Sequence, residues 1–229
     1  MQLLNPTIVM RKTLRRVFTR PVNPLLTTQV EYPQLVAERT PLVFQSINDH
    51  YAKMANDFMA YGYTKLQRQA LMDYEASRRN NYPFHAHEAL KDFTVHYDIN
   101  CTFSLSFDTY TYTGGAHGST LRSADTWNLL NGRRYALKDF FPAGYDYRKY
   151  IIDEVRAQML IQLEEDDSLY FSVETAAIDA AYNEKDFYLV PDGIIVFFQQ
   201  YAIAPYAVGI PEFLIPFSSS PAVEPMCKR

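Results

Sequence analysis

The spacing of apolar and polar residues changes its period along the chain. Residues 7–18 and 27–32 are rich in β-branched side chains, which is typical of strands. After Pro41 the apolar residues recur at steps of three and four, as on one face of a helix: Phe44, Ile47, Tyr51, Met54, Phe58 and Tyr61. Gly62 is expected to end or loosen this helix, after which helical spacing resumes toward Asn80.

The second half of the chain mixes strand and helix periods. Strict alternation predicts two strands, whose apolar faces are Phe93, Val95, Tyr97 and Ile99, then Phe103, Leu105 and Phe107. Residues 119–128 are expected to return antiparallel to the second of them. Asn131-Gly132 and Asp192-Gly193 are hairpin signals, the first of them leading into a strand in "RRYAL". Helical spacing covers 145–163, and 214–217 is expected to form a last short strand.

These blocks predict the α+β class, with an antiparallel sheet of hairpins packed by one long and one or two shorter helices. Two closely packed subregions are expected. Residues 1–90 would hold the first strands and the long helix, and residues 91–220 the remaining elements, followed by a tail at 221–229. No internal repeat or low-complexity linker interrupts the chain.

Charge and composition exclude some classes of protein. The 229 residues have a formal net charge of −4, which argues against general nucleic-acid binding. No apolar run is long enough to span a bilayer, and the chain as given begins without a signal peptide. A bridge between Cys101 and Cys227 is not favoured, since a cysteine so near a chain end rarely meets disulfide geometry.

The common catalytic and metal motifs are missing, including phosphate-binding glycine loops and paired C-x-x-C. His85 and His87 would project from one face of a strand, but further zinc ligands are not at hand. The acidic run 164–167 follows a helix and lacks the alternation of a calcium loop. We therefore expect no metal and no cofactor, and enzymatic activity is less expected than binding.

The stretch "YTGGAHG", residues 112–118, follows a predicted strand. Gly114 and Gly115 suit a turn that needs positive φ angles. His117 can hold this turn by bonding to backbone, contact a ligand, or act as a general base, and the first of these is the expected role. Tyr112 stands at the start of the turn.

A second irregular stretch, residues 199–217, has prolines at 205, 211 and 216 that forbid a regular central strand. Tyr201, Pro205 and Tyr206 lie within it. A proline-stiffened aromatic segment loses little entropy on binding, which suits recognition. A segment that simply wraps a sheet edge is an equal alternative.

Together with "NLLNGRRYALKDFF" at 128–141, the segments "YTGGAHG" and "YAIAPYAVG" (201–209) resemble the extracellular domain of the anti-sigma-V factor family. A similar domain accompanies the catalytic domain of some peptidoglycan deacetylases. In the first branch the domain is a receptor that binds lysozyme, and in the second it is an accessory module. This chain has no sigma-binding segment, membrane helix or deacetylase domain, so the resemblance implies a sensing domain of undetermined ligand.

The leading hypothesis is a non-catalytic module that binds a cell-envelope ligand, either a lysozyme-like protein or peptidoglycan glycan. The alternatives are a small hydrolase with His117 as general base and a structural accessory domain. By resemblance the location is extracellular or in the cell envelope. The expected ligand-binding residues gather at one end of the sheet and form one surface: Tyr112, Gly114, Gly115, His117, Tyr201, Pro205 and Tyr206.

Overall fold

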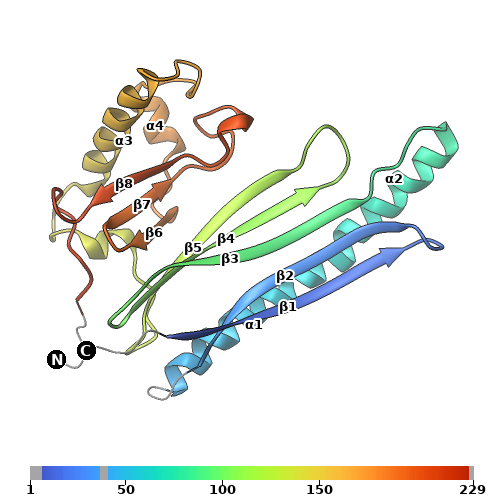
Figure 1. Ribbon diagram of the computed structural model, residues 1–229, viewed down its shortest axis with the longest axis horizontal. Helices are drawn as coiled ribbons and strands as arrows, with labels where there is room; N and C mark the ends of the chain where they lie inside the picture. Colours follow the sequence, from blue (N-terminus) through green and yellow to red (C-terminus); the bar gives the residue numbers. More distant parts are fainter. Residues whose placement is uncertain (1–6, 37–40, 227–229) are drawn as a thin grey trace. The chain divides into compact units, whose positions relative to one another are not determined.

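The computed structural model describes residues 7–36 and 41–226 (Figure 1). Strands within these residues form two sheets, one in the order β1-β2-β3-β4-β5 and one in the order β6-β7-β8. The helices come in blocks between groups of strands and do not alternate with single strands. The predicted α+β class is confirmed.

The first two strands form a long antiparallel hairpin. β1 (Ile8–Thr19) pairs with β2 (Pro24–Val36), and Leu14 lies opposite Val30. β1 is an edge strand whose side chains are exposed or half-buried, whereas β2 has a series of buried positions. The basic residues of β1 therefore lie at a sheet edge, where charge discourages pairing with another strand.

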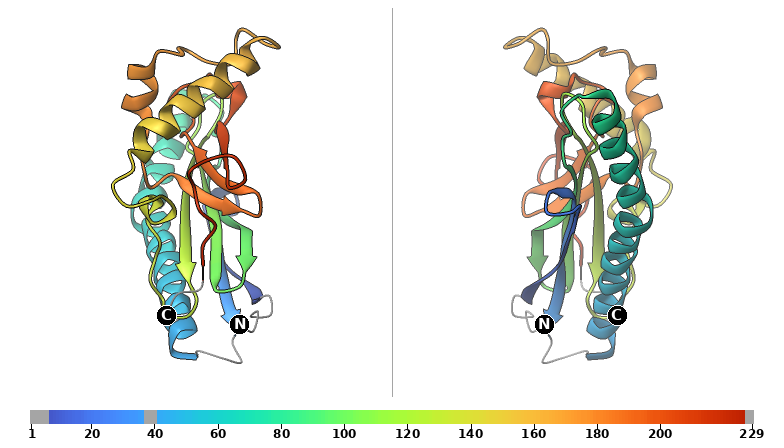
Figure 2. Two further views of the ribbon diagram at one scale, coloured as in Figure 1. Left: turned by 90° about the vertical axis from the view of Figure 1, so that its left-hand side faces the viewer. Right: turned by 90° about the vertical axis from the view of Figure 1, so that its right-hand side faces the viewer.

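A continuous helical segment follows this hairpin. α1 (Pro41–Tyr61) passes through a π-helical turn (Gly62–Leu66) into α2 (Gln67–Asn80), so Gly62 loosens the helix without ending it. The segment packs along β2 (Figures 1 and 2). Ala55 is fully buried and Tyr61 is exposed, so the buried stripe does not extend to Tyr61 as the pattern predicted.

The helical segment returns the chain to the sheet beside β2. β3 (His87–Ile99) runs parallel to β2, and Leu26 lies opposite His87 in this pairing. Parallel neighbours cannot be joined by a tight turn and need a long crossover, which the helices supply. The expected sheet of hairpins thus contains one parallel pair, which the sequence pattern did not predict.

β4 (Thr102–Tyr112) and β5 (Ser119–Asn128) complete the first sheet. The chain reverses after β5 at Gly132, which has a φ of 72° and donates its N–H to the Asn128 carbonyl at 2.8 Å. The strand expected after this turn is absent from the described residues, where a 3₁₀ turn at 137–140 replaces it after one bridge. Asp139 accepts the Ala136 N–H at 2.8 Å, which stabilises the turn.

The remaining elements build a second layered structure. α3 (Tyr147–Leu163) is confirmed, and α4 (Thr175–Ala181) is a second shorter helix, whose position the sequence pattern did not predict. The Asp192-Gly193 turn joins β6 (Phe187–Val190) to β7 (Gly193–Phe197) as expected, and β8 (Glu212–Pro216) pairs with β7.

α3 covers this three-stranded sheet with an apolar stripe. Its residues Ile151, Val155 and Met159 are fully buried and share one core with the inner face of the sheet. Burying an aliphatic side chain of this size contributes about 1.5–3 kcal/mol. The core of this part therefore has its own source of stability, and its sheet members include Leu189, Ile194, Val196, Phe213 and Ile215.

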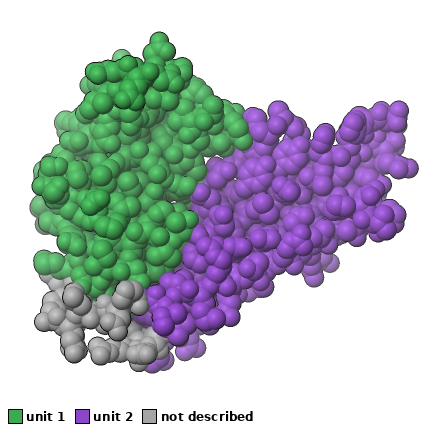
Figure 3. Space-filling view, in the orientation of Figure 1, with its two compact units in different colours: residues 1–6, 94–106, 122–229 green, residues 7–93, 107–121 purple. Residues whose placement is uncertain are grey.

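The described residues fall into two compact units (Figure 3). The first unit, which we call the C-terminal unit, comprises residues 94–106 and 122–226. The second, the helical-crossover unit, comprises 7–93 without 37–40, together with 107–121. The chain contributes to the two units in alternation, and the division into subregions at residue 90 stays a prediction.

Cys101 is fully buried and disulfide-bonded. The sequence had disfavoured a bridge for this residue. Cys227, the other cysteine of the sequence, lies outside the described residues.

The contact between Gly62 and Thr28 yields a first prediction. A Cβ added at Gly62 would lie 2.5 Å from Thr28 Oγ1 and 2.7 Å from Thr28 Cγ2, closer than van der Waals contact allows. We expect Gly62→Ala to lower the free energy of unfolding by about 1–3 kcal/mol through overpacking, although alanine is the better helix former.

The matched variant is Thr28→Ala, which removes both atoms that clash. In this background Gly62→Ala should cost less than in the wild type, and urea denaturation of all four proteins gives the coupling energy. Equal costs in both backgrounds would show that the helix does not approach β2 at this point.

His87 yields a second prediction. Its side chain is buried, its ring stacks on Phe84, and its Nδ1 has no hydrogen-bond partner in the described part of the chain. Burial lowers the pKa of His87 from its ordinary value of 6.5, and Asp73, 3.4 Å from Nε2, opposes this only in part. The unfolded chain therefore binds a proton at this position more readily than the folded chain.

Titration of His87 should consequently lower the free energy of unfolding as the pH drops below about 6.5. His87→Leu removes the titrating group, so the wild type should lose stability relative to this variant between about pH 8 and about pH 5. Thermal unfolding at several pH values measures the difference. A difference that stays constant over this range would contradict the prediction.

Candidate functional site

The turn at 112–118 joins β4 to β5 in the helical-crossover unit. Gly114 and Gly115 have φ angles of 92° and 98°, which side chains with a Cβ rarely adopt. The hydroxyl of Tyr112 donates to the Gly115 carbonyl at 3.0 Å and closes the turn. The Tyr112 hydroxyl therefore holds the turn that contains the two glycines.

His117 is exposed, and its Nδ1 donates to the carbonyl of Gly118 at 3.0 Å. A carbonyl can only accept, so this bond requires a proton on Nδ1, and in the neutral ring Nε2 is then the acceptor nitrogen. Gly118 packs against the ring of Tyr110, and a Cβ there would lie 2.4 Å from Tyr110 Cε2. The turn-holding role expected for His117 agrees with this geometry.

The second predicted segment lies in the C-terminal unit, after β7. Tyr201 is 50% exposed with a φ of 67°, and its ring packs on that of Tyr206 with 5.7 Å between centroids. Pro205 precedes a 3₁₀ turn that begins at Tyr206. Ile203 and Ala204, which lie between Tyr201 and Pro205 in the sequence, are buried. They attach the middle of the segment to the core while the Tyr201 ring lies on the surface.

Gln199 fixes the start of this segment through three hydrogen bonds. Its side chain accepts the N–H of Arg122 at 3.0 Å and donates to the Arg122 carbonyl at 2.8 Å. It also donates to the Asp186 carboxylate at 2.9 Å. Burial raises the pKa of Asp186, and the bonds from Gln199 and Asn183 act in the opposite direction. The aromatic segment therefore begins at a rigid point next to β5.

Phe171 joins this segment and was missed by the sequence analysis. Its N–H donates to the Ile203 carbonyl at 2.9 Å, and its side chain is 60% exposed. The preceding Tyr170 points inward, donating to Gln162 and packing on Phe213. In the sequence, Phe171 stood out only as a large apolar residue in a polar connection, outside any helical or strand period.

The two predicted segments belong to different compact units (Figure 3). The turn at 112–118 is in the helical-crossover unit, and Tyr201, Pro205 and Tyr206 are in the C-terminal unit. Their joint surface stays a prediction. Within the C-terminal unit, the hydrogen bond from Phe171 to Ile203 joins the segments that carry Phe171, Tyr201 and Tyr206, and we call these three residues the aromatic surface.

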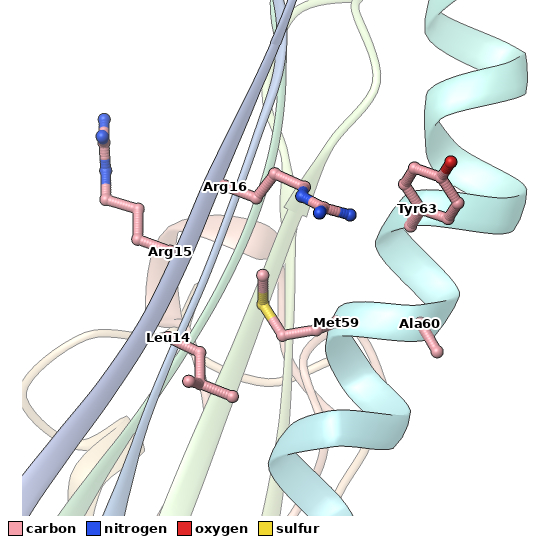
Figure 4. A pocket seen from close by; sticks show the side chains of 6 residues that line it. All are labelled: Leu14, Arg15, Arg16, Met59, Ala60 and Tyr63. Atoms are coloured by element: carbon pink, nitrogen blue, oxygen red, sulfur yellow. The ribbon is translucent and has the colours of Figure 1, made fainter.

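The described residues also form a cavity in each unit outside these segments. One, of about 350 Å³, lies between β1 and the α1 end, where the Arg16 guanidinium extends toward Tyr63 at 5.0 Å from its ring centroid (Figure 4). The other, of about 330 Å³, lies in the C-terminal unit between residues 124–126, 134–138 and 184–187. Neither is lined by a residue that the sequence analysis selected.

Within residues 7–36 and 41–226, no group of three or more His, Cys, Asp or Glu side chains is placed to hold a metal ion. His85 is exposed before β3, whereas His87 is buried in it, so these two do not share one exposed face. None of the helices described is sufficiently long and apolar to cross a membrane.

The glycine turn yields a third prediction. A Cβ at Gly115 meets no atom within 4 Å, so backbone strain at its φ of 98° is the cost of a substitution. We expect Gly115→Val to lower the free energy of unfolding by about 1–3 kcal/mol. Ala116→Val, at the exposed neighbour without a positive φ, is the control and should change stability little. Equal melting temperatures for Gly115→Val and the wild type would contradict this.

Two family models match separate parts of the chain. Residues 22–120, which include the turn at 112–118, match a model described as deacetylase PdaC. Residues 138–218, which include the aromatic surface, match a model described as a protein of unknown function, DUF3298. These matches indicate an accessory domain.

The fold is similar to those of two solved DUF3298 proteins. One, from Bacteroides fragilis, has a TM-score of 0.71 at 20% identity, over 94% of this chain and 93% of the other. The second, from Pseudomonas aeruginosa, has a TM-score of 0.59 at 15% identity, over 96% of this chain and 94% of the other. At such identities the likeness is one of fold. No curated protein matches the chain.

Proposed function

We propose that this chain is a non-catalytic module that binds a cell-envelope ligand, and that the ligand is a lysozyme-like protein. The observation that supports this most is the aromatic surface. Phe171 and Tyr201 are exposed rings on segments that a backbone hydrogen bond joins. Exposed aromatic rings held in place are the side chains that most often anchor protein interfaces.

The rigidity of the aromatic surface favours binding. Gln199 holds the segment at its start, and Ile203 and Ala204 hold it in the middle. The Ala202 N–H also donates to the Gln199 carbonyl at 2.9 Å. A surface that is ordered before binding loses little conformational entropy when the partner arrives.

Charge beside the aromatic surface favours a basic partner. The acidic run Glu164, Glu165, Asp166 and Asp167 lies in the connection that leads to Phe171, and all four residues are exposed. Asp166 accepts from the N–H and hydroxyl of Ser168, which lower the pKa of its carboxyl group. Exposed carboxylates accelerate the approach of a positively charged protein and contribute to its selection.

Peptidoglycan glycan is the second candidate ligand. Flat aromatic rings with polar tips also offer contact area to a sugar. The match of residues 22–120 to the deacetylase PdaC model supports a relation to the cell wall. Both ligands place the protein outside the cell or in its envelope, and this location is part of the proposal.

The two alternatives make different demands. A hydrolase with His117 as general base requires a nucleophile or water at Nε2 and a substrate held beside it. A structural accessory domain requires only a partner protein that it positions. Incubation with muropeptides tests the first, because the binding module leaves them intact.

Binding of lysozyme and of purified muropeptides to the whole chain gives the fourth prediction. We expect saturable binding of lysozyme by calorimetry. Phe171→Ala and Tyr201→Ala should each weaken it by about 2 kcal/mol, or about thirtyfold, because each removes an anchoring ring. The lysozyme affinity of His117→Ala measures whether the turn at 112–118 contributes to binding.

Tyr82→Ala is the matched control, since Tyr82 is 51% exposed but lies in the helical-crossover unit. Ribonuclease A serves as a second basic protein, which should bind more weakly than lysozyme. Absence of binding to both lysozyme and muropeptides would refute the proposed function. Equal loss in the Tyr82 variant would refute the assignment to the aromatic surface.

A further inference from the structure

We propose that the cavity between residues 124–126, 134–138 and 184–187 is a binding site for a small ring-bearing carboxylate, such as an acidic sugar. We call it the lysine cleft. Its volume of about 330 Å³ is at the small end of the range for ligand pockets, which suits one or two sugar rings. Its residues are separate from the aromatic surface, so this site is independent of the proposed function.

Three separate segments build the lysine cleft. One wall is the end of β5, and the chain reversal after it brings Arg134 back beside Trp127. The Tyr135 N–H donates to the Thr126 carbonyl at 2.8 Å, which holds this wall to β5. The opposite wall is the connection into β6, and Tyr147, the first residue of α3, contributes its side chain.

Both carboxylates that line the cleft already have partners. Asp125 Oδ1 is paired with the Arg134 guanidinium at 3.3 Å, and Arg134 also lies over the Trp127 ring at 4.6 Å. Glu184 accepts the hydroxyl of Tyr147 at 3.0 Å. Burial raises the pKa of Tyr147, and Glu184 adds to this, so the hydroxyl stays a donor to the carboxylate at neutral pH.

Two ammonium groups also line the cleft, and Glu184 keeps its negative charge because its tyrosine partner is neutral. Lys138 and Lys185 both line it, and neither has an ion pair or a side-chain hydrogen bond to another described residue. Asp125 and Arg134 offset each other and one ammonium group offsets the Glu184 carboxylate, so the charges that line the cleft sum to +1, in a chain whose net charge is −4. An anionic group on a ligand is what these ammonium groups would bind.

The apolar part of the cleft argues for a ring beside the anionic group. Tyr135, Tyr147 and Phe187 line it together with the two lysines. Tyr135 is fixed by Asn128, which donates to its hydroxyl at 2.9 Å, and Tyr147 stacks on Phe141 with 5.3 Å between centroids. These contacts fix the two tyrosine rings, which offer an apolar surface to the ring of a ligand. Inorganic phosphate has no ring to place on this surface.

Titration of the whole isotope-labelled chain with glucuronate, glucose and inorganic phosphate tests the proposal. Glucuronate should shift the amide resonances of residues around Lys138, Tyr147 and Lys185 saturably, and glucose should not. Phosphate should bind more weakly than glucuronate because it lacks a ring. The double variant Lys138→Gln and Lys185→Gln should weaken glucuronate binding about tenfold or more, by loss of two charge-assisted bonds.

Two further variants distinguish binding in the cleft from a general attraction of the anion to positive charge. Ala136→Trp leaves every charge in place but fills the cleft, and it should abolish glucuronate binding. Lys65→Gln removes the same charge from the helical-crossover unit and should leave binding unchanged. The proposal is overturned if glucuronate gives no saturable shifts, if phosphate binds as tightly, or if the double variant or Ala136→Trp binds like the wild type. Lysozyme binding is measured on the same variants and should be unaffected.

Discussion

The parallel pairing of β2 with β3 is the constraint on which the first sheet depends. Two parallel neighbours require a connection that crosses back over the sheet, and the helical segment from Pro41 to Asn80 makes this crossing. Its passage over β2 is close enough that a Cβ at position 62 would clash with the Thr28 side chain.

The C-terminal unit depends on a different kind of contact. Here side chains tie irregular segments to regular ones: Gln199 joins the aromatic segment to β5 and to Asp186. A buried polar group that loses its hydrogen-bond partner destabilises the fold, so this network favours a single conformation of the segment. This accounts for an exposed tyrosine with positive φ on a segment that is otherwise well packed.

The distribution of charge separates two surfaces of the C-terminal unit. Acidic residues lead to the aromatic surface, whereas lysines without partners line the cleft. A net charge of −4 would not have indicated either feature, because it averages over both. The two surfaces therefore suit ligands of opposite charge, a basic protein at one and a small anion at the other.

Local pattern in the sequence was enough to predict most elements. The strands at 7–18 and 119–128, the helix at 145–163 and the turn at Asp192-Gly193 follow from side-chain period or from turn chemistry. The turn with Gly114 and Gly115 was predictable for the same reason, since positive φ is a property of single residues. Pro205 likewise marked where a regular strand could not continue.

Only the tertiary structure decided the features that join distant residues. Three of these features bring together residues far apart in the sequence: the parallel pair, the contact of Phe171 with Ile203 and the lysine cleft. The 3₁₀ turn that replaced an expected strand after Gly132 depends on a cap from Asp139. Periodicity reports which face of an element is apolar, but it carries no information on which other element covers that face.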